Sequence, residues 1–163
     1  VYITQVRYDA GYGADDPGFA LQHWKMYLRA TVNAILDVET HTAAMTEAEA
    51  MALMVDGAWQ EEDEASGKWL RARISSTQLS TYFVGSLEMW DLEMEVRRRL
   101  AVAAGAGAAD VPAQHIRGGV GDSPGFEQRA HLERVISYGT PPVRWCRHLT
   151  LRDLDAAAGG AAA

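Results

Sequence analysis

Five polar side chains stand in apolar helical patterns and have the chemical types that line catalytic clefts: Asp37, His41, Gln78, Tyr82 and His131. Asp37 and His41 are one helical turn apart, so the carboxylate can orient the imidazole or hold it protonated. Gln78 and Tyr82 have the same spacing. A phenol and an imidazolium are hydrogen-bond donors that can stabilise a developing oxyanion in a cleft between helices.

The same residues also have a structural explanation, which the sequence leaves open. An Asp-His pair with this spacing is more often a pair on a helix surface, and a Tyr in an apolar stripe is more often part of the core. Complete catalytic motifs are missing: the sequence has no HExxH or Cys-rich zinc spacing and no Glu-x-x-His of a di-iron bundle, and no GxSxG or Walker loop follows a predicted strand. We therefore expect no metal site made by this chain alone, and acid-base catalysis by its own carboxylates has no specific motif.

The composition predicts an acidic protein without a nucleic-acid partner. Fifteen Lys and Arg stand against 22 Asp and Glu, a formal net charge of -7 that repels phosphate. The one basic cluster, Arg97 to Arg99, is expected to pair with Glu93 and Glu95 on a solvated helix face. No stretch approaches the roughly 18 apolar residues of a membrane span. The compartment stays open between the cytoplasm and export, and the start at Val1 suggests a cut end of something longer.

Hydrophobic periodicity predicts an all-α protein, an irregular array of several helices. Asp16-Pro17 is a helix start, and apolar residues with helical spacing follow to about His41. Thr46 to Glu49 has the form of a capping box that opens a second helix. Two further helices are expected to meet at the polar stretch 75–77. The segment 1–8 can be either a strand or the end of a helix.

The expected domain organisation is a helical domain or half-domain over residues 1–155. The stretch 103–123 is rich in Gly and Ala and is expected to be a loop insertion. Helix is expected again from Ser123, with a stop at 138–142 and a last short helix to about Leu149. The Ala and Gly tail 156–163 is expected to be disordered.

The chain resembles the C-terminal part of the bacterial domain of unknown function 885 family. Asp37 to His41 resembles the family's Asp-Thr-Gly-Ile-His, and the segment 45–50 resembles the Trp-Thr-x-x-x-Ala that follows it. The family's Pro-Gly-Gln-x-x-Ser-Tyr-x-x-Gly motif, with an upstream Arg, and its Phe-Asp-x-x-x-Phe-His segment are also in register. The matching positions there are Arg71, Gln78, Tyr82, Gly85, Phe126, His131, Gly139 and Pro142.

The family resembles helical zinc metallopeptidases of the gluzincin kind, which implies a function for this chain. It would be the C-terminal portion of a zinc-dependent metallopeptidase or amide hydrolase with a peptide substrate. His41 and Tyr82 would be the catalytic donors, oriented or supported by Asp37, Arg71, Gln78 and His131. The zinc of the complete protein would be held by ligands outside this chain, in the upstream half of the same protein or in a companion chain.

The sequence departs from the family pattern at three positions. Asn33 stands about where an Arg is expected, Glu39 where Gly is expected, and Ser76-Thr77 where Pro-Gly is expected. The alternative function is a non-catalytic helical interaction or scaffold module, favoured by the absence of metal ligands and by the acidic surface. Under this alternative, changes at His41 and Tyr82 would affect stability only.

Overall fold

The structure is a computed structural model that describes residues 1–107, 111 and 123–160. Within these residues the chain forms seven α-helices and one π-helical segment and has no β-strand, which confirms the predicted all-α class. The elements are α1 (Tyr2–Asp9), α2 (Pro17–Thr42), α3 (Glu47–Met51), the π-helix η1 (Ala52–Asp56), α4 (Glu62–Ile74), α5 (Thr81–Ala103), α6 (Gln128–Ser137) and α7 (Val143–Gly160). In the described part of the chain, no helix combines the length and hydropathy that crossing a membrane requires.

Local signals place the helix starts as predicted. The Asp16 carboxylate accepts a hydrogen bond from the Gly18 amide at 2.8 Å, and Pro17 occupies the first turn of α2. Thr46 and Glu49 form the reciprocal capping box at the start of α3. The open choice for residues 1–8 is settled as helix α1.

The described helices belong to two compact units, Val1–Ser86 and Leu87–Ala163; the sequence predicts a helical domain or half-domain over residues 1–155. The division follows from the cores, since each unit has its own cluster of buried apolar side chains. The boundary between the units falls inside α5. Helix periodicity does not indicate it, because α5 is one continuous helix. We describe each unit by itself.

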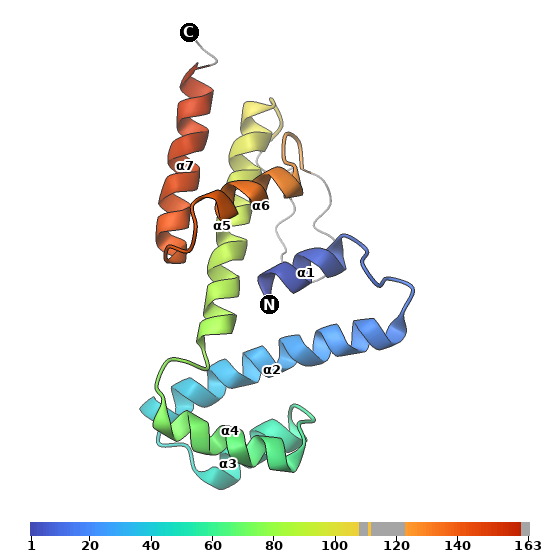
Figure 1. Ribbon diagram of the computed structural model, residues 1–163, viewed down its shortest axis with the longest axis vertical. Coiled ribbons are helices and arrows are strands. Elements are labelled where there is room, and N and C mark those ends of the chain that lie inside the picture. Colours follow the sequence, from blue (N-terminus) through green and yellow to red (C-terminus); the bar gives the residue numbers. More distant parts are fainter. Residues whose placement is uncertain (108–110, 112–122, 161–163) are drawn as a thin grey trace. The chain divides into compact units, whose positions relative to one another are not determined.

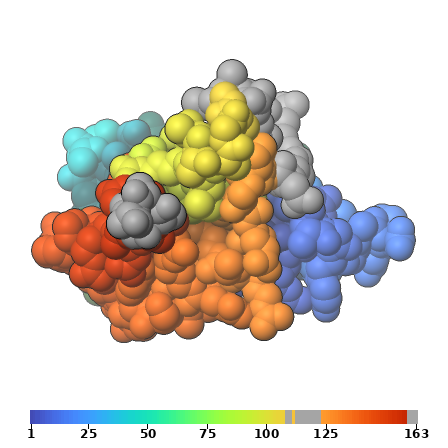
Figure 2. All heavy atoms as spheres, turned by 90° about the horizontal axis from the view of Figure 1, so that it is seen from above, coloured from blue at the N-terminus to red at the C-terminus, as the bar shows by residue number. Residues whose placement is uncertain are grey.

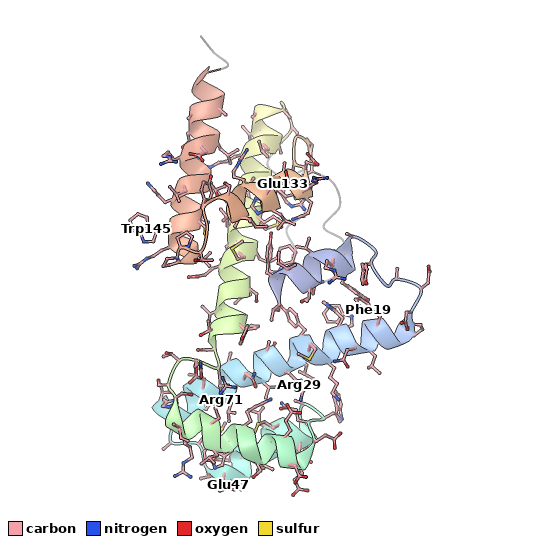
Figure 3. All side chains as sticks on the ribbon, viewed as in Figure 1. Phe19, Arg29, Glu47, Arg71, Glu133 and Trp145 are labelled. Atoms are coloured by element: carbon pink, nitrogen blue, oxygen red, sulfur yellow. The ribbon has the colours of Figure 1, made fainter. Side chains whose placement is uncertain are left out.

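The first unit is built around α2. Helix α1 packs on one side of α2, and the pair α3–α4 lies on the other (Figure 1). Its core combines Leu36 of α2, Met54 of η1 and Trp69 of α4. Figure 3 shows Arg29 reaching from α2 toward α4, where its guanidinium pairs with Glu64. Burial of these apolar faces holds α2 in place, and α2 carries the predicted site residues Asp37 and His41.

The second unit packs the C-terminal part of α5 against α6 and α7, shown in yellow, orange and red in Figure 2. Its core contains Leu92 and Val96 of α5, Phe126 before α6, and Cys146 and Leu154 of α7. Trp145 of α7, labelled in Figure 3, is about half exposed beside the buried Cys146.

Three details differ from the sequence prediction, and the first is that α6 begins at Gln128, where helix is expected again from Ser123. Helix α7 continues to Gly160, past both the predicted end at Leu149 and the start of the predicted tail at Ala156, because alanine extends a helix that is already nucleated. Residues 161–163 of that tail lie outside the described residues, as do 108–110 and 112–122 of the predicted insertion. Arg97 does pair with Glu93, but both side chains are buried instead of standing on a solvated face.

Candidate functional site

Asp37 is buried on α2, and its carboxylate accepts hydrogen bonds from the segment that leads into α5. Oδ1 accepts a hydrogen bond from the Thr77 amide at 3.0 Å. Oδ2 accepts from the Ser80 amide at 3.0 Å and from the Ser80 hydroxyl at 2.8 Å. Burial alone would raise the pKa of Asp37, but the hydrogen bonds from Ser80 and Thr77, with His41 nearby, lower it below the ordinary value. The side chain therefore works as an ionised cap that joins two segments of the first unit.

Thr77 lies in the left-handed region, with φ of 66°. This conformation favours glycine, and the family pattern places a Gly at this position. The hydrogen bond from the Thr77 amide to Asp37 holds the turn despite the added side chain. The departure from Pro-Gly therefore leaves the turn in place, at the cost of strain at one residue.

His41 is one turn beyond Asp37 and remains partly exposed. Its Nδ1 lies 2.8 Å from the Asp37 carbonyl oxygen and 3.4 Å from the Asp37 carboxylate. Since a carbonyl oxygen only accepts, Nδ1 carries the hydrogen. Neutral His41 therefore presents a lone pair at Nε2, and it donates from Nε2 only as the imidazolium.

Arg71 and Gln78 meet across the junction between α4 and α5. The Arg71 guanidinium donates to the Gln78 side-chain oxygen at 3.1 Å, and both residues are exposed. The structure thus gathers four of the six predicted site residues around this junction: Asp37, His41, Arg71 and Gln78.

Tyr82 is the second residue of α5 and has 68% of its surface exposed, so it is not a core residue of the described unit. It contributes to the wall of a pocket of about 460 Å³ whose lining comes entirely from the first unit, and of the six predicted residues it alone does so. The pocket lies along α1 and α2 and is mostly apolar. Its lining residues are Val1, Thr4, Arg7, Phe19, Gln22, His23, Met26, Tyr27, Arg29, Ala30, Asn33 and Tyr82.

A hydrogen-bonded chain of side chains that the sequence does not predict runs from Asp9 through Gln5 to His23, which is part of the pocket lining. Gln5 donates from Nε2 to the Asp9 carboxylate at 2.8 Å, and the Gln5 oxygen lies 3.0 Å from Nε2 of His23. The His23 ring stacks on Tyr8 with centroids 4.4 Å apart. Gln5 and Asp9 have helical i, i+4 spacing, the one signal the sequence offers. His23 on α2 is 18 residues away from Gln5, and no local sequence pattern indicates that the two side chains meet.

His131 lies in the second unit. It is buried beside Phe126, and neither ring nitrogen has a hydrogen-bond partner. Burial lowers the pKa of His131 to about 4, so the ring is neutral at physiological pH. Its surroundings are those of a core residue within its own unit.

The described residues do not fit a metal site. No group of three or more His, Cys, Asp or Glu side chains comes together in that part of the chain. The structural zinc sites of proteins use four protein ligands and the catalytic ones three. Any zinc of the complete protein would thus need ligands beyond these residues.

Comparison with known proteins identifies relatives of the chain. Residues 1–144 match the family described as "Bacterial protein of unknown function (DUF885)". The solved structure of a putative lipoprotein of unknown function from Shewanella oneidensis matches with a TM-score of 0.72 and 33% sequence identity. The match covers 90% of this chain and 23% of that one, so this chain spans about a quarter of the length of that relative. The sequence has no match among curated proteins.

Proposed function

The chain belongs to the bacterial DUF885 family, and from this premise we propose that it is the C-terminal, cleft-wall portion of a zinc-dependent peptidase or amide hydrolase. The observation that carries the proposal is the placement of Tyr82, an exposed phenol on the wall of a mostly apolar pocket of ligand size. The metal ligands would come from the upstream half of the same protein or from a companion chain. Bound there, zinc would supply an activated water.

The contribution of this chain is binding and hydrogen-bond donation. Attack of water on a peptide carbonyl places negative charge on the carbonyl oxygen, and a phenol O–H directed at that oxygen stabilises it. Tyr82 is free to act in this way because its side chain is exposed. His41 would donate from Nε2 as the imidazolium, with its ring oriented by the Asp37 carbonyl.

Arg71 and Gln78 would support the same wall. Their mutual hydrogen bond fixes the direction of both side chains beside Ser75. His131 is the weakest member of the proposed set, since burial inside the second unit leaves its ring nitrogens without solvent or a hydrogen-bond partner.

The test uses the full-length protein, with zinc measured by mass spectrometry and hydrolysis followed on a mixed peptide library. We expect about one zinc per chain and a kcat about a hundredfold lower for Tyr82→Phe. Tyr12→Phe is the matched control, since Tyr12 is an exposed tyrosine of the same unit outside the pocket. An unchanged kcat in Tyr82→Phe would remove Tyr82 from the site.

A second candidate is a non-catalytic interaction or scaffold module, and one observation favours it. Both oxygens of Asp37 are occupied in capping the entry to α5, a purely structural task. A metal-free protein without hydrolytic activity, in which His41 and Tyr82 variants change stability alone, would support this module and reject the hydrolase.

A further inference from the structure

The pocket of the first unit has the dimensions and walls of a small-molecule site. Its volume of about 460 Å³ lies in the range of roughly 300 to 1,000 Å³ that ligand pockets occupy. Apolar surface comes from Phe19, Met26, Tyr27 and Ala30. Figure 3 shows Phe19 on the side of α2 that faces α1, where its ring meets Tyr8 and Tyr12. These walls favour an apolar group over a polar one.

Two buried polar atoms of lining residues have no partner, the side-chain oxygen of Asn33 and Nε of Arg29. The side-chain oxygen of Asn33 is buried and accepts no hydrogen bond in the described structure. A buried acceptor without a donor costs free energy, and rotation of the partly exposed Asn33 side chain would turn the oxygen toward a donor group on a ligand and recover that cost. Asn33 therefore favours a ligand that carries an N–H or O–H next to its apolar part.

His23 is another polar residue of the lining, and its ring also offers an acceptor. Gln5 uses its amide nitrogen on Asp9, so its oxygen faces His23, and Nε2 of His23 must donate to it. Burial lowers the pKa of His23, which keeps the ring neutral and leaves the lone pair on Nδ1. The chain Asp9, Gln5 and His23 thus fixes one tautomer and offers the pocket no N–H from this ring.

The charged groups on the lining are both cationic. Arg29 is paired with Glu64, and the Arg7 guanidinium lies over the Tyr12 ring, 4.1 Å from its centroid. No carboxylate stands on the lining. A positively charged side chain would meet the Arg7 guanidinium there with no carboxylate of the lining to offset it, so a cationic group is disfavoured.

We infer that this pocket binds a bulky, neutral, apolar side chain of the substrate, aromatic or branched, and that Asn33 accepts a hydrogen bond from the N–H beside it. The inference rests on the proposed function and narrows it, because it names the class of peptide that the hydrolase would take. Substrates with Phe or Leu at the bound position fit these features, and those with Ala or Lys do not.

The test is calorimetric titration of the full-length protein with three neutral-backbone probes. These are N-acetyl-L-phenylalaninamide and its alanine and lysine counterparts. Burial of a phenyl group predicts a Kd about tenfold lower for the phenylalanine probe than for the alanine probe. The lysine probe should bind no better than the alanine probe. Equal Kd values for all three would overturn the inference without any variant.

A pair of variants on α2 tests the role of Asn33. Asn33→Leu removes the acceptor and should raise the Kd of the phenylalanine probe about fivefold. Thr40→Val is the matched control, because the Thr40 hydroxyl is likewise buried without a partner but lies outside the pocket. Both variants should keep or raise Tm, and only the first should weaken binding. An unchanged Kd in Asn33→Leu would overturn the hydrogen bond to Asn33.

Chromatography of the probes separates this inference from the proposed function. Selective binding of a probe that is recovered intact, in a protein that cleaves no peptide, supports the pocket and rejects the hydrolase. Peptide hydrolysis that is indifferent to the apolar side chain, with equal Kd values, supports the hydrolase and rejects the pocket's selectivity.

Discussion

Asp37 and Ser80 are joined by two hydrogen bonds across 43 residues of sequence. The Ser80 amide and hydroxyl both donate to Oδ2 of the buried carboxylate, at 3.0 and 2.8 Å. An N-cap side chain accepts hydrogen bonds from backbone amides at the start of a helix. The Asp37 carboxylate has this role for α5, although Asp37 itself belongs to α2. The pair therefore fixes the entry to α5, and with it the position of Tyr82.

Replacing Asp37 with Asn should destabilise the first unit. The amide keeps the size of the carboxylate but loses its charge and turns one acceptor into a donor, which must face either the Thr77 amide or the two donors of Ser80. We expect a loss of about 2 kcal/mol in the free energy of unfolding, measured by urea denaturation. Asp56→Asn, outside this contact, is the control and should change stability little. A stable Asp37→Asn protein would show that the cap is dispensable.

The Asp37 contribution should also depend on pH in a defined direction. The pKa of Asp37 is lowered in the folded protein from its ordinary value of 3.8, so the folded state favours the ionised form. Its stabilisation is complete above the unfolded pKa and is lost as the pH falls through the lowered folded pKa. The stability difference between wild type and Asp37→Asn should stay constant from neutral pH down to about pH 5 and shrink below 3.8. A difference that grows on acidification would contradict an ionised cap.

The sequence predicts those features whose cause lies within a few residues. Asp16 and Pro17 start α2, and Thr46 with Glu49 starts α3, because a cap bonds to amides two or three residues away. The polar break between α4 and α5 is likewise local. The choice between strand and helix for residues 1–8 was open because eight residues carry too little periodicity.

The sequence does not reveal contacts made by distant segments. Asp37 and His41 are correctly paired by spacing, yet the main partners of Asp37 are Thr77 and Ser80, about 40 residues further on. The hydrogen bond between Gln5 and His23 cannot be predicted for the same reason, because the two residues lie on different helices. The separation of His131 from the other site residues, in another unit, reflects a division of the core that periodicity along one helix does not encode.

The buried ion pair of the second unit should be costly to break from one side. Glu93 and Arg97 are almost fully buried, and Arg97 also donates to Ser123 and Gln128 and lies over the Phe126 ring. Arg97→Met leaves the Glu93 charge in the core without its guanidinium, at a cost of about 3 to 5 kcal/mol in urea denaturation.

The double variant Glu93→Leu, Arg97→Met tests the cause of that loss. Removal of both charges should recover part of the stability, because the uncompensated carboxylate is gone. The Gln128 amide, which donates to Glu93 at 3.0 Å, then loses its acceptor, so recovery should be incomplete. If the double variant is less stable than Arg97→Met, the penalty comes from lost packing and not from the stranded charge.

His131 should make the second unit sensitive to acid. Its pKa is lowered from 6.5 to about 4 in the folded protein by burial, so the unfolded chain binds more protons than the folded one between these two values. Stability then falls as the pH drops from 6.5 to 4, by about 3 kcal/mol in the limit of full linkage.

His131→Leu removes a ring whose nitrogens have no partner, so it should be as stable as wild type or more stable at pH 7 and should lose this acid sensitivity. His148→Leu, at an exposed site on α7, should retain it. Urea denaturation of the three proteins at several pH values decides the matter. If His131→Leu keeps the wild-type pH profile while hydrolysis is lost, His131 is a substrate-binding residue and not a neutral core side chain.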